Sequence, residues 1–197
     1  MQPTYCIFAG INGAGKTTLF KSNMWQTESI PPKLFRVNPD EIIKTNKMSP
    51  NNVNDQLQAG KIAINQINAY FEEEKSFTHE TVFAGKTSLR RIKEAKRKKY
   101  KIILNYIGLK NYQLAIKRIE HRVLTGGHAI NPELVKRRWK LSLKNFKNAK
   151  ELCDEVHVFD NTELLKEIAI WHNGTLCWWG ARHLYDNWLA NSLLELP

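Results

Sequence analysis

The glycine-rich stretch at residues 10–17 constrains the fold of this chain more than any other part of its sequence. It reads GINGAGKT and matches the pattern GxxxxGK[ST], whose backbone N–H groups wrap around a phosphate. A short apolar run at residues 5–9 precedes it, and a helical pattern follows from Lys16 onward. Because the N-terminal end of a helix favours anions, a strand, this loop and a helix in succession form a phosphate site. The stretch therefore predicts an α/β fold that binds a nucleotide.

The loop also predicts which residues hold the nucleotide and its metal ion. We expect the Lys16 ammonium to reach the β- and γ-phosphates and the Thr17 hydroxyl to bind Mg²⁺. ATP and Mg²⁺ are thus the expected cofactors. The predicted nucleotide-binding residues follow one another without a gap and are Gly10, Ile11, Asn12, Gly13, Ala14, Gly15, Lys16, Thr17 and Thr18.

Strand and helix patterns alternate along the chain, which predicts a mainly parallel sheet flanked by helices. Five strands are expected, at residues 5–9, 34–37, 76–81, 102–107 and 156–159. Helical patterns fill the gaps, at residues 16–25, 54–75, 87–99, 112–124 and 132–152. The expected fold class is α/β, a P-loop NTPase or kinase fold with a five-stranded sheet.

The C-terminal part of the chain has a different pattern. Two apolar runs, residues 167–171 and 175–179, flank Asn173-Gly174, a pair typical of the tight turn in a β-hairpin. A final helix is expected at residues 181–194. We therefore expect a kinase-type core at residues 1–165, with a lid at residues 122–150, and a C-terminal hairpin and helix at residues 166–197.

Composition excludes several other classes of protein. No apolar run approaches the roughly 20 residues that a membrane-spanning helix needs, and the N-terminus shows no signal-peptide pattern. The three cysteines include no CxxC pair, which argues against a disulfide framework and a zinc site and favours a reducing compartment. We expect a cytoplasmic protein without a membrane partner.

The absence of other motifs narrows the class of nucleotide-binding protein. A GTPase needs an Asn-Lys-x-Asp guanine reader, and the nearest match, residues 46–49, reads NKMS and lacks the Asp. The chain contains no LSGGQ, and no predicted strand ends in an apolar run plus Asp of Walker B type, since the run at residues 102–107 is followed by Gly108. These absences favour the small-molecule kinases.

Two acids are expected at the sheet edge where ligands bind in open α/β folds. Asp40 follows the second strand after Asn38-Pro39, and its carboxylate could accept the proton of an attacking hydroxyl. The alternative is that Asp40 belongs to the first turn of a helix, where the dipole favours an acid. Glu80 ends the third strand, either as a ligand of substrate hydroxyls or as a solvated carboxylate.

A Gly126-Gly127 turn between two predicted helices gives the chain a hinge such as a lid needs. Asn131 is a suitable N-cap for the second of these helices, with Pro132 at its first position. Arginines on either side of the hinge could neutralise a phosphoryl group in transfer. They are Arg122, Arg137 and Arg138.

Helical geometry separates the last two arginines. The apolar face of the helix at residues 132–152 is formed by Val135, Trp139, Phe146 and Ala149. At about 100° per residue, Arg138 lies about 60° from the centre of that face and Arg137 about 160°. We therefore predict that Arg138 faces the site and that Arg137 faces solvent.

The net charge of +11 suits a polyanionic partner without identifying it. Residues 90–101 hold eight basic side chains and one acid. A solvated surface helix is the favoured interpretation. A nucleic-acid footprint is the less favoured alternative, because no aromatic residues are interleaved as stacking platforms.

Taken together, these motifs resemble the zeta toxin-like kinases, in particular their short chromosomal branch. The resemblance extends over nearly the whole chain and is carried by residues 10–17, Asn38-Pro39-Asp40-Glu41-Ile42, Glu80-Thr81, Gly126-Gly127-His128, Arg137-Arg138, Ser142-Leu143, Asn145 and Asp160-Asn161-Thr162. It implies a kinase fold that uses ATP and Mg²⁺. Known members phosphorylate UDP-N-acetylglucosamine and are neutralised by an antitoxin that obstructs the nucleotide site.

The resemblance also implies roles for individual residues. Asp40 matches the catalytic base, and Lys16, Arg122 and Arg138 match the groups that neutralise phosphate charge. The implied substrate-binding residues are Asn38, Glu80 and Thr81. The leading hypothesis is an ATP-dependent kinase for a small-molecule hydroxyl, with a sugar nucleotide as acceptor and an antitoxin as partner. The alternatives are a kinase of nucleic-acid ends and a non-enzymatic ATP-binding module.

Overall fold

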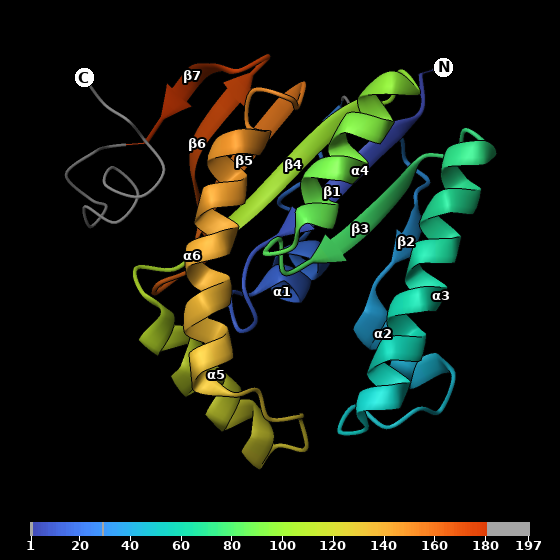
Figure 1. Cartoon of the computed structure of the whole chain (residues 1–197). Coiled ribbons are helices and arrows are strands. Elements are labelled where there is room, and N and C mark those ends of the chain that lie inside the picture. Colours follow the sequence, from blue (N-terminus) through green and yellow to red (C-terminus); the bar gives the residue numbers. More distant parts are fainter. Residues whose placement is uncertain (1, 29, 181–197) are drawn as a thin grey trace.

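The computed structural model describes residues 2–28 and 30–180, which form one seven-stranded sheet with helices on both faces (Figure 1). The strands lie side by side in the order β2-β3-β1-β4-β5-β6-β7. They are β1 (Thr4–Ala9), β2 (Phe35–Val37), β3 (Phe77–Thr81), β4 (Lys101–Gly108), β5 (Glu155–Asp160), β6 (Lys166–His172) and β7 (Thr175–Trp179). The expected helix at residues 181–194 lies outside the described residues.

The first five strands pair in parallel and correspond to the five predicted ones. The central strands β1 and β4 are buried almost throughout, as expected for strands covered by helices on both faces. The predicted count of five is nevertheless wrong for the sheet as a whole. Strands β6 and β7, joined at Asn173-Gly174, extend it as antiparallel neighbours of β5. Their backbone groups thereby satisfy the otherwise unpaired edge of β5.

Six helices accompany the strands in the described part of the chain. They are α1 (Lys16–Ser22), α2 (Pro39–Thr45), α3 (Val53–Glu72), α4 (Lys86–Arg97), α5 (Tyr112–Leu124) and α6 (Pro132–Ala149). One apolar core joins α2, α3, α4 and the C-terminal half of α6 to one face of the sheet. A second joins α1, α5 and Val135 at the start of α6 to the other face. In Figure 1, α3, α4 and α6 lie in front of the strands.

The short helix α2 was not predicted, because seven residues are too few to show a helical period. Two residues at its first turn are nevertheless typical of a helix start. The Asn38 side chain caps it by accepting a hydrogen bond from the Asp40 backbone N–H at 2.9 Å, and Pro39 occupies the first turn. Asp40 therefore does lie at a helix N-terminus, as one of the two interpretations held.

Parallel pairing brings the carboxyl ends of β1, β2 and β3 to one edge of the sheet. The phosphate loop follows β1, α2 follows β2, and Glu80 lies near the end of β3. Segments far apart in sequence thus meet at one edge, where the loop between α5 and α6 also lies close to α2 (Figure 1). None of the described helices is long and apolar enough to span a membrane.

Candidate active site

The phosphate loop has the backbone shape that its glycines were expected to provide. Gly13 and Gly15 have φ values of 78° and 100°, in the left-handed region that side chains disfavour. A Cβ at Gly13 would lie 2.8 Å from the Ala115 carbonyl oxygen, and one at Gly15 would collide with the Asn161 amide. Asn161 also donates a hydrogen bond to the Ala14 carbonyl at 2.8 Å. The phosphate loop therefore packs against α5 and against the segment that follows β5.

Lys16 is buried at the start of α1, and its ammonium donates to the Ile11 carbonyl at 3.1 Å. Burial lowers its pKa, while the negative charges of Glu80 and Asp40 act in the opposite direction. A cation folded back onto the loop in this way is placed to meet a phosphate. The predicted lysine and both predicted acids therefore share one electrostatic environment.

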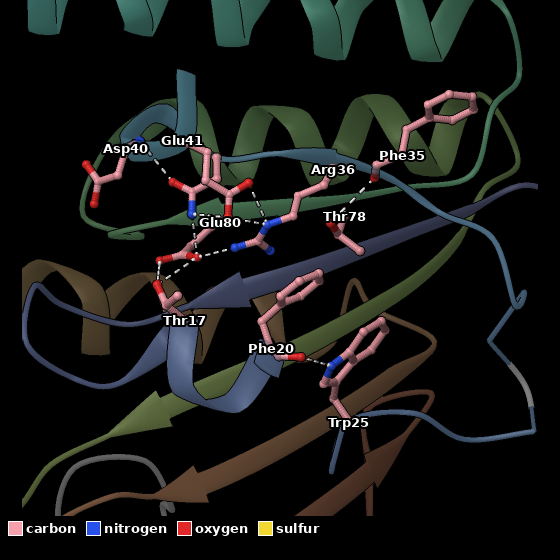
Figure 2. A network of polar contacts seen from close by, with 10 residues as sticks. Thr17, Phe20, Trp25, Phe35, Arg36, Asp40, Glu41, Thr78 and Glu80 are labelled. Carbon is pink, nitrogen blue, oxygen red and sulfur yellow. Dashed lines mark hydrogen bonds and ion pairs between the residues drawn. The ribbon is translucent and has the colours of Figure 1, made fainter. Parts of the chain in front are cut away.

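Glu80 joins the phosphate loop to the second strand (Figure 2). The Thr17 hydroxyl donates to its two carboxylate oxygens at 3.1 and 3.3 Å. Asn38 and Arg36 also donate to Oε2, at 2.9 and 3.0 Å. Glu80 is 7% exposed, so it is not the solvated carboxylate that sequence reasoning left open.

Arg36 is a residue of this network that sequence reasoning missed. Its Nε donates to both Glu41 oxygens, at 2.8 and 2.9 Å, and its guanidinium lies 3.5 Å from the centre of the Phe20 ring. It thus holds two acids and packs on α1 at once (Figure 2). The available signal was an arginine inside a short apolar strand, where a charge needs a partner.

Asp40 lies at the opening of the site. Its side chain is exposed and points away from Thr17 and Glu80 in Figure 2. It lines two neighbouring cavities, of about 280 and about 300 Å³, which share Asn12, Pro39 and Val82. The smaller one also contains Lys16 and Glu80, and the larger one extends to the loop between α5 and α6. A groove therefore runs from the phosphate loop past Asp40.

Arg138 faces the phosphate loop and Arg137 is exposed, the difference that helical phase predicted. Arg138 donates from its guanidinium to the Asn12 side chain of the phosphate loop at 2.9 Å and lines the larger cavity. Arg137 is exposed. The link between Arg138 and Asn12 brings α6 to the loop across 126 positions of sequence.

Arg122 lies near the end of α5 and forms hydrogen bonds with the Gly126-Gly127-His128 segment that follows the helix. Its guanidinium donates to the His128 carbonyl at 3.4 Å, and its own carbonyl accepts from the Gly127 N–H at 2.9 Å. The pKa of His128 is lowered by burial and by Arg122, and Asp40 opposes this shift. His128 lines the larger cavity, and it is a second residue that sequence reasoning left without a role.

The remaining predicted substrate residues differ in what the structure shows for them. Asn38 is 4% exposed and bonded to both Asp40 and Glu80, which makes it a support of the site. Thr81 lines the smaller cavity and accepts a hydrogen bond from the Phe83 N–H at 3.2 Å. A larger cavity of about 410 Å³, between Trp25, Leu34 and Thr78, contains none of the predicted residues.

A Mg²⁺ ion fits the donors at the loop only in company with a nucleotide. No group of three or more His, Cys, Asp or Glu side chains that could hold a metal occurs within the described residues. The hydroxyl of Thr17 and the carboxylate of Glu80 are hard oxygen donors beside the phosphate cradle. Mg²⁺ is commonly held by one or two such groups together with phosphates and water, so the two residues suit it.

One relative is similar to this chain in sequence. No family model matches the chain. An uncharacterized protein of Haemophilus influenzae is 29% identical over 140 residues, which cover 71% of this chain and 94% of that protein.

Solved structures share the fold at low sequence identity. A chain from the PezAT chromosomal toxin–antitoxin system of Streptococcus pneumoniae has a TM-score of 0.58 at 14% identity, covering 83% of this chain and 70% of its own length. A chain of the AvrRxo1-ORF1:-ORF2 complex with ATP has a TM-score of 0.63 at 15% identity, covering 89% of this chain. A Chloroflexus aurantiacus protein, proposed to be a kinase, has a TM-score of 0.51 at 17% identity, covering 71% of this chain and 80% of its own length.

These structures confirm the resemblance to the zeta toxin-like kinases at the level of the fold. The described part of the chain has an α/β fold that these structures share. The chain spans 60% of the length of the AvrRxo1 chain that it matches.

Proposed function

We propose that this protein is an ATP-dependent kinase that transfers the γ-phosphoryl group to a hydroxyl of a small molecule. The observation that carries the proposal is the convergence of charge on one groove. Lys16 interacts electrostatically with Asp40, Glu80, Arg122 and Arg138. With Lys16 itself, these groups come from five separate elements. Two of the similar structures are consistent with it, since one contains ATP and another is proposed to be a kinase.

The proposed chemistry assigns each group a part. The Asp40 carboxylate accepts the proton of the acceptor hydroxyl as the hydroxyl oxygen attacks the γ-phosphorus. The bond between the γ-phosphorus and the β,γ-bridging oxygen breaks, and ADP leaves. Lys16, Arg122 and Arg138 stabilise the charge on the equatorial oxygens of the transferring group. Mg²⁺, bound by Thr17 and Glu80, would offset the charge of the β- and γ-phosphates. The hinge at Gly126-Gly127 would close the groove and exclude water.

For the acceptor we propose a sugar nucleotide, with UDP-N-acetylglucosamine as the first compound to test. The resemblance to the zeta toxin-like kinases suggests it, and the net charge of +11 suits an acceptor that carries a pyrophosphate. The protein would then be a toxin with an antitoxin partner, as in the PezAT toxin–antitoxin system.

The experiment is to incubate the wild type and Asp40→Asn with labelled ATP and a metabolite extract. We expect a labelled sugar nucleotide with the wild type and none with the variant, while both bind ATP. Label on nucleic-acid ends would favour the second candidate, a nucleic-acid-end kinase. Slow ATP turnover with no labelled acceptor would favour a non-enzymatic module.

A further inference from the structure

The charge of this protein is concentrated on two neighbouring helices. Together α4 and α6 carry twelve basic and two acidic side chains, in a chain whose net charge is +11. The two acids are Glu94 and Glu133. A patch of one sign and this size attracts polyanions and raises their local concentration.

On α4 the basic residues form a stripe that faces outward. The helix buries Ser88, Arg91, Ile92 and Ala95 against the sheet. Since an α-helix turns by about 100° per residue, four side chains project within about 30° of the direction opposite this buried face. They are Lys86, Arg90, Lys93 and Arg97, and all four are exposed.

A second stripe runs along α6. This helix buries Val135, Ser142, Leu143, Phe146 and Ala149. The opposite direction is within about 50° of three exposed basic side chains. They are Arg137, Lys140 and Lys144. Within residues 2–28 and 30–180, none of the seven stripe residues forms an ion pair with an acid.

The two stripes lie beside each other on one face of the molecule. Both helices pack in the same apolar core, and Asn145 of α6 donates to the Phe83 and Gly85 carbonyls just before α4, at 2.8 and 3.1 Å. Figure 1 shows α6 next to α4 in front of the sheet. The axes of packed helices lie about 8–10 Å apart, so we expect the two basic rows at a separation of that order.

The chemistry of the rows selects the partner. A protein interface needs aromatic or apolar anchors, and Leu141, 39% exposed, is the one large hydrophobic side chain that α4 and α6 expose. A single nucleic-acid strand needs aromatic stacking platforms, which the rows do not offer. Point charges in two rows match the phosphates on either side of a duplex groove, which is about 12 Å wide for the major groove of B-DNA.

We propose that the outward faces of α4 and α6 bind the phosphate backbone of a nucleic-acid duplex. The inference does not depend on the proposed phosphotransfer. It concerns a surface formed by α4 and the outer side of α6, whereas Arg138 and the groove lie on the inner side.

Anisotropy of a labelled DNA duplex, measured over a range of KCl concentrations, tests the surface. For seven phosphate contacts, log K should fall against log salt with a slope of about −6. The double variants Arg90→Glu/Lys93→Glu on α4 and Lys140→Glu/Lys144→Glu on α6 should each reduce that slope by about two and weaken binding about tenfold or more.

The matched control is Lys21→Glu/Lys117→Glu, which makes the same charge change at exposed sites on α1 and α5, the helices of the opposite face. It should bind nearly as the wild type does, and thermal melting should show all variants to be folded. Equal weakening by the control, or the absence of salt-dependent binding by the wild type, would overturn the proposal. Tighter binding of a single strand than of the duplex would also overturn it. So would displacement of the duplex by poly-glutamate at a lower concentration of charge than the DNA itself carries, which would indicate an acidic protein as the partner.

Discussion

The Thr17 hydroxyl donates a hydrogen bond to the Glu80 carboxylate at 3.1 Å and so ties the phosphate loop to the end of β3. Neither of the strands next to β1, which are β3 and β4, ends in an apolar run followed by Asp, the usual source of an acid at this place. Here a glutamate from the strand next to β1 occupies it. Glu80 is therefore as well placed for the metal as for the substrate contact that the resemblance implies.

We expect Glu80→Gln to lower kcat by about a hundredfold or more, because a neutral amide holds Mg²⁺ less strongly than a carboxylate does, and that ion would offset the charge of the phosphates. The concentration of Mg²⁺ that gives half the maximal rate should rise, which a titration of rate against Mg²⁺ measures. The control is Glu41→Gln, which removes the other acid bound to Arg36, and it should stay within about threefold of the wild type. An unchanged Mg²⁺ requirement in Glu80→Gln would contradict the metal role.

Asp40→Asn should lower kcat by about a thousandfold and leave the Kd for ATP within about twofold, since a general base acts on the acceptor alone. Single-turnover rates and equilibrium binding of ATP separate the two effects. Asp55→Asn provides a control, because Asp55 is also in the first turn of a helix, α3, and does not itself line the groove. Turnover retained by Asp40→Asn would leave Asp40 with a role only at the N-terminus of α2.

The two adjacent arginines of α6 make a paired test. Arg138→Ala should lower kcat/KM by about a hundredfold, because it removes a charge near the transferring group together with the hydrogen bond to Asn12. Arg137→Ala should remain within about twofold, since its side chain is exposed. Steady-state kinetics measure kcat/KM for both variants. A larger loss of kcat/KM in Arg137→Ala than in Arg138→Ala would show that the groove is not the site of transfer.

His157 should make stability depend on pH in the alkaline range. Burial acts to lower its pKa, but the hydrogen bond of its ring to Glu167, its 3.5 Å contact with Glu155 and the negative charges of both acids outweigh burial and raise the pKa to about 9. The bond to Glu167 is 2.6 Å long. A raised pKa means that the folded state holds the proton more tightly. The stabilisation is complete below pH 6.5 and is lost as the pH rises through about 9.

The expected size of this contribution is at most about 3 kcal/mol. Urea unfolding at pH 6 to 10, with His157→Gln for comparison, measures it as the difference between the two stability profiles. The wild type should lose its advantage over the variant as the pH rises through that range. A constant difference across the range would show that His157 is not charged in the folded protein.

Local pattern was enough to predict the part of the fold that positions the nucleotide. The run at residues 5–9, the loop after it and the helix from Lys16 are where the pattern puts them, and the helix α5 has the predicted bounds. Such elements are coded by neighbouring residues, through burial and backbone preference. The joining of β6 and β7 to the edge of β5 was not predictable, because it depends on contacts between strands and not on either strand alone.

The sequence by itself determined a phosphate loop, its lysine and threonine, and an acid at the end of each of two strands, because these are motifs of fixed spacing. It also determined, through helical phase, which of two arginines faces inward. Only the tertiary structure decided that Thr17 meets Glu80, that Arg36 holds Glu80 and Glu41 together, and that Arg138 reaches Asn12. The reason is physical, since these contacts join residues from 5 to 126 positions apart and depend on how parallel strands and the helices over them are packed.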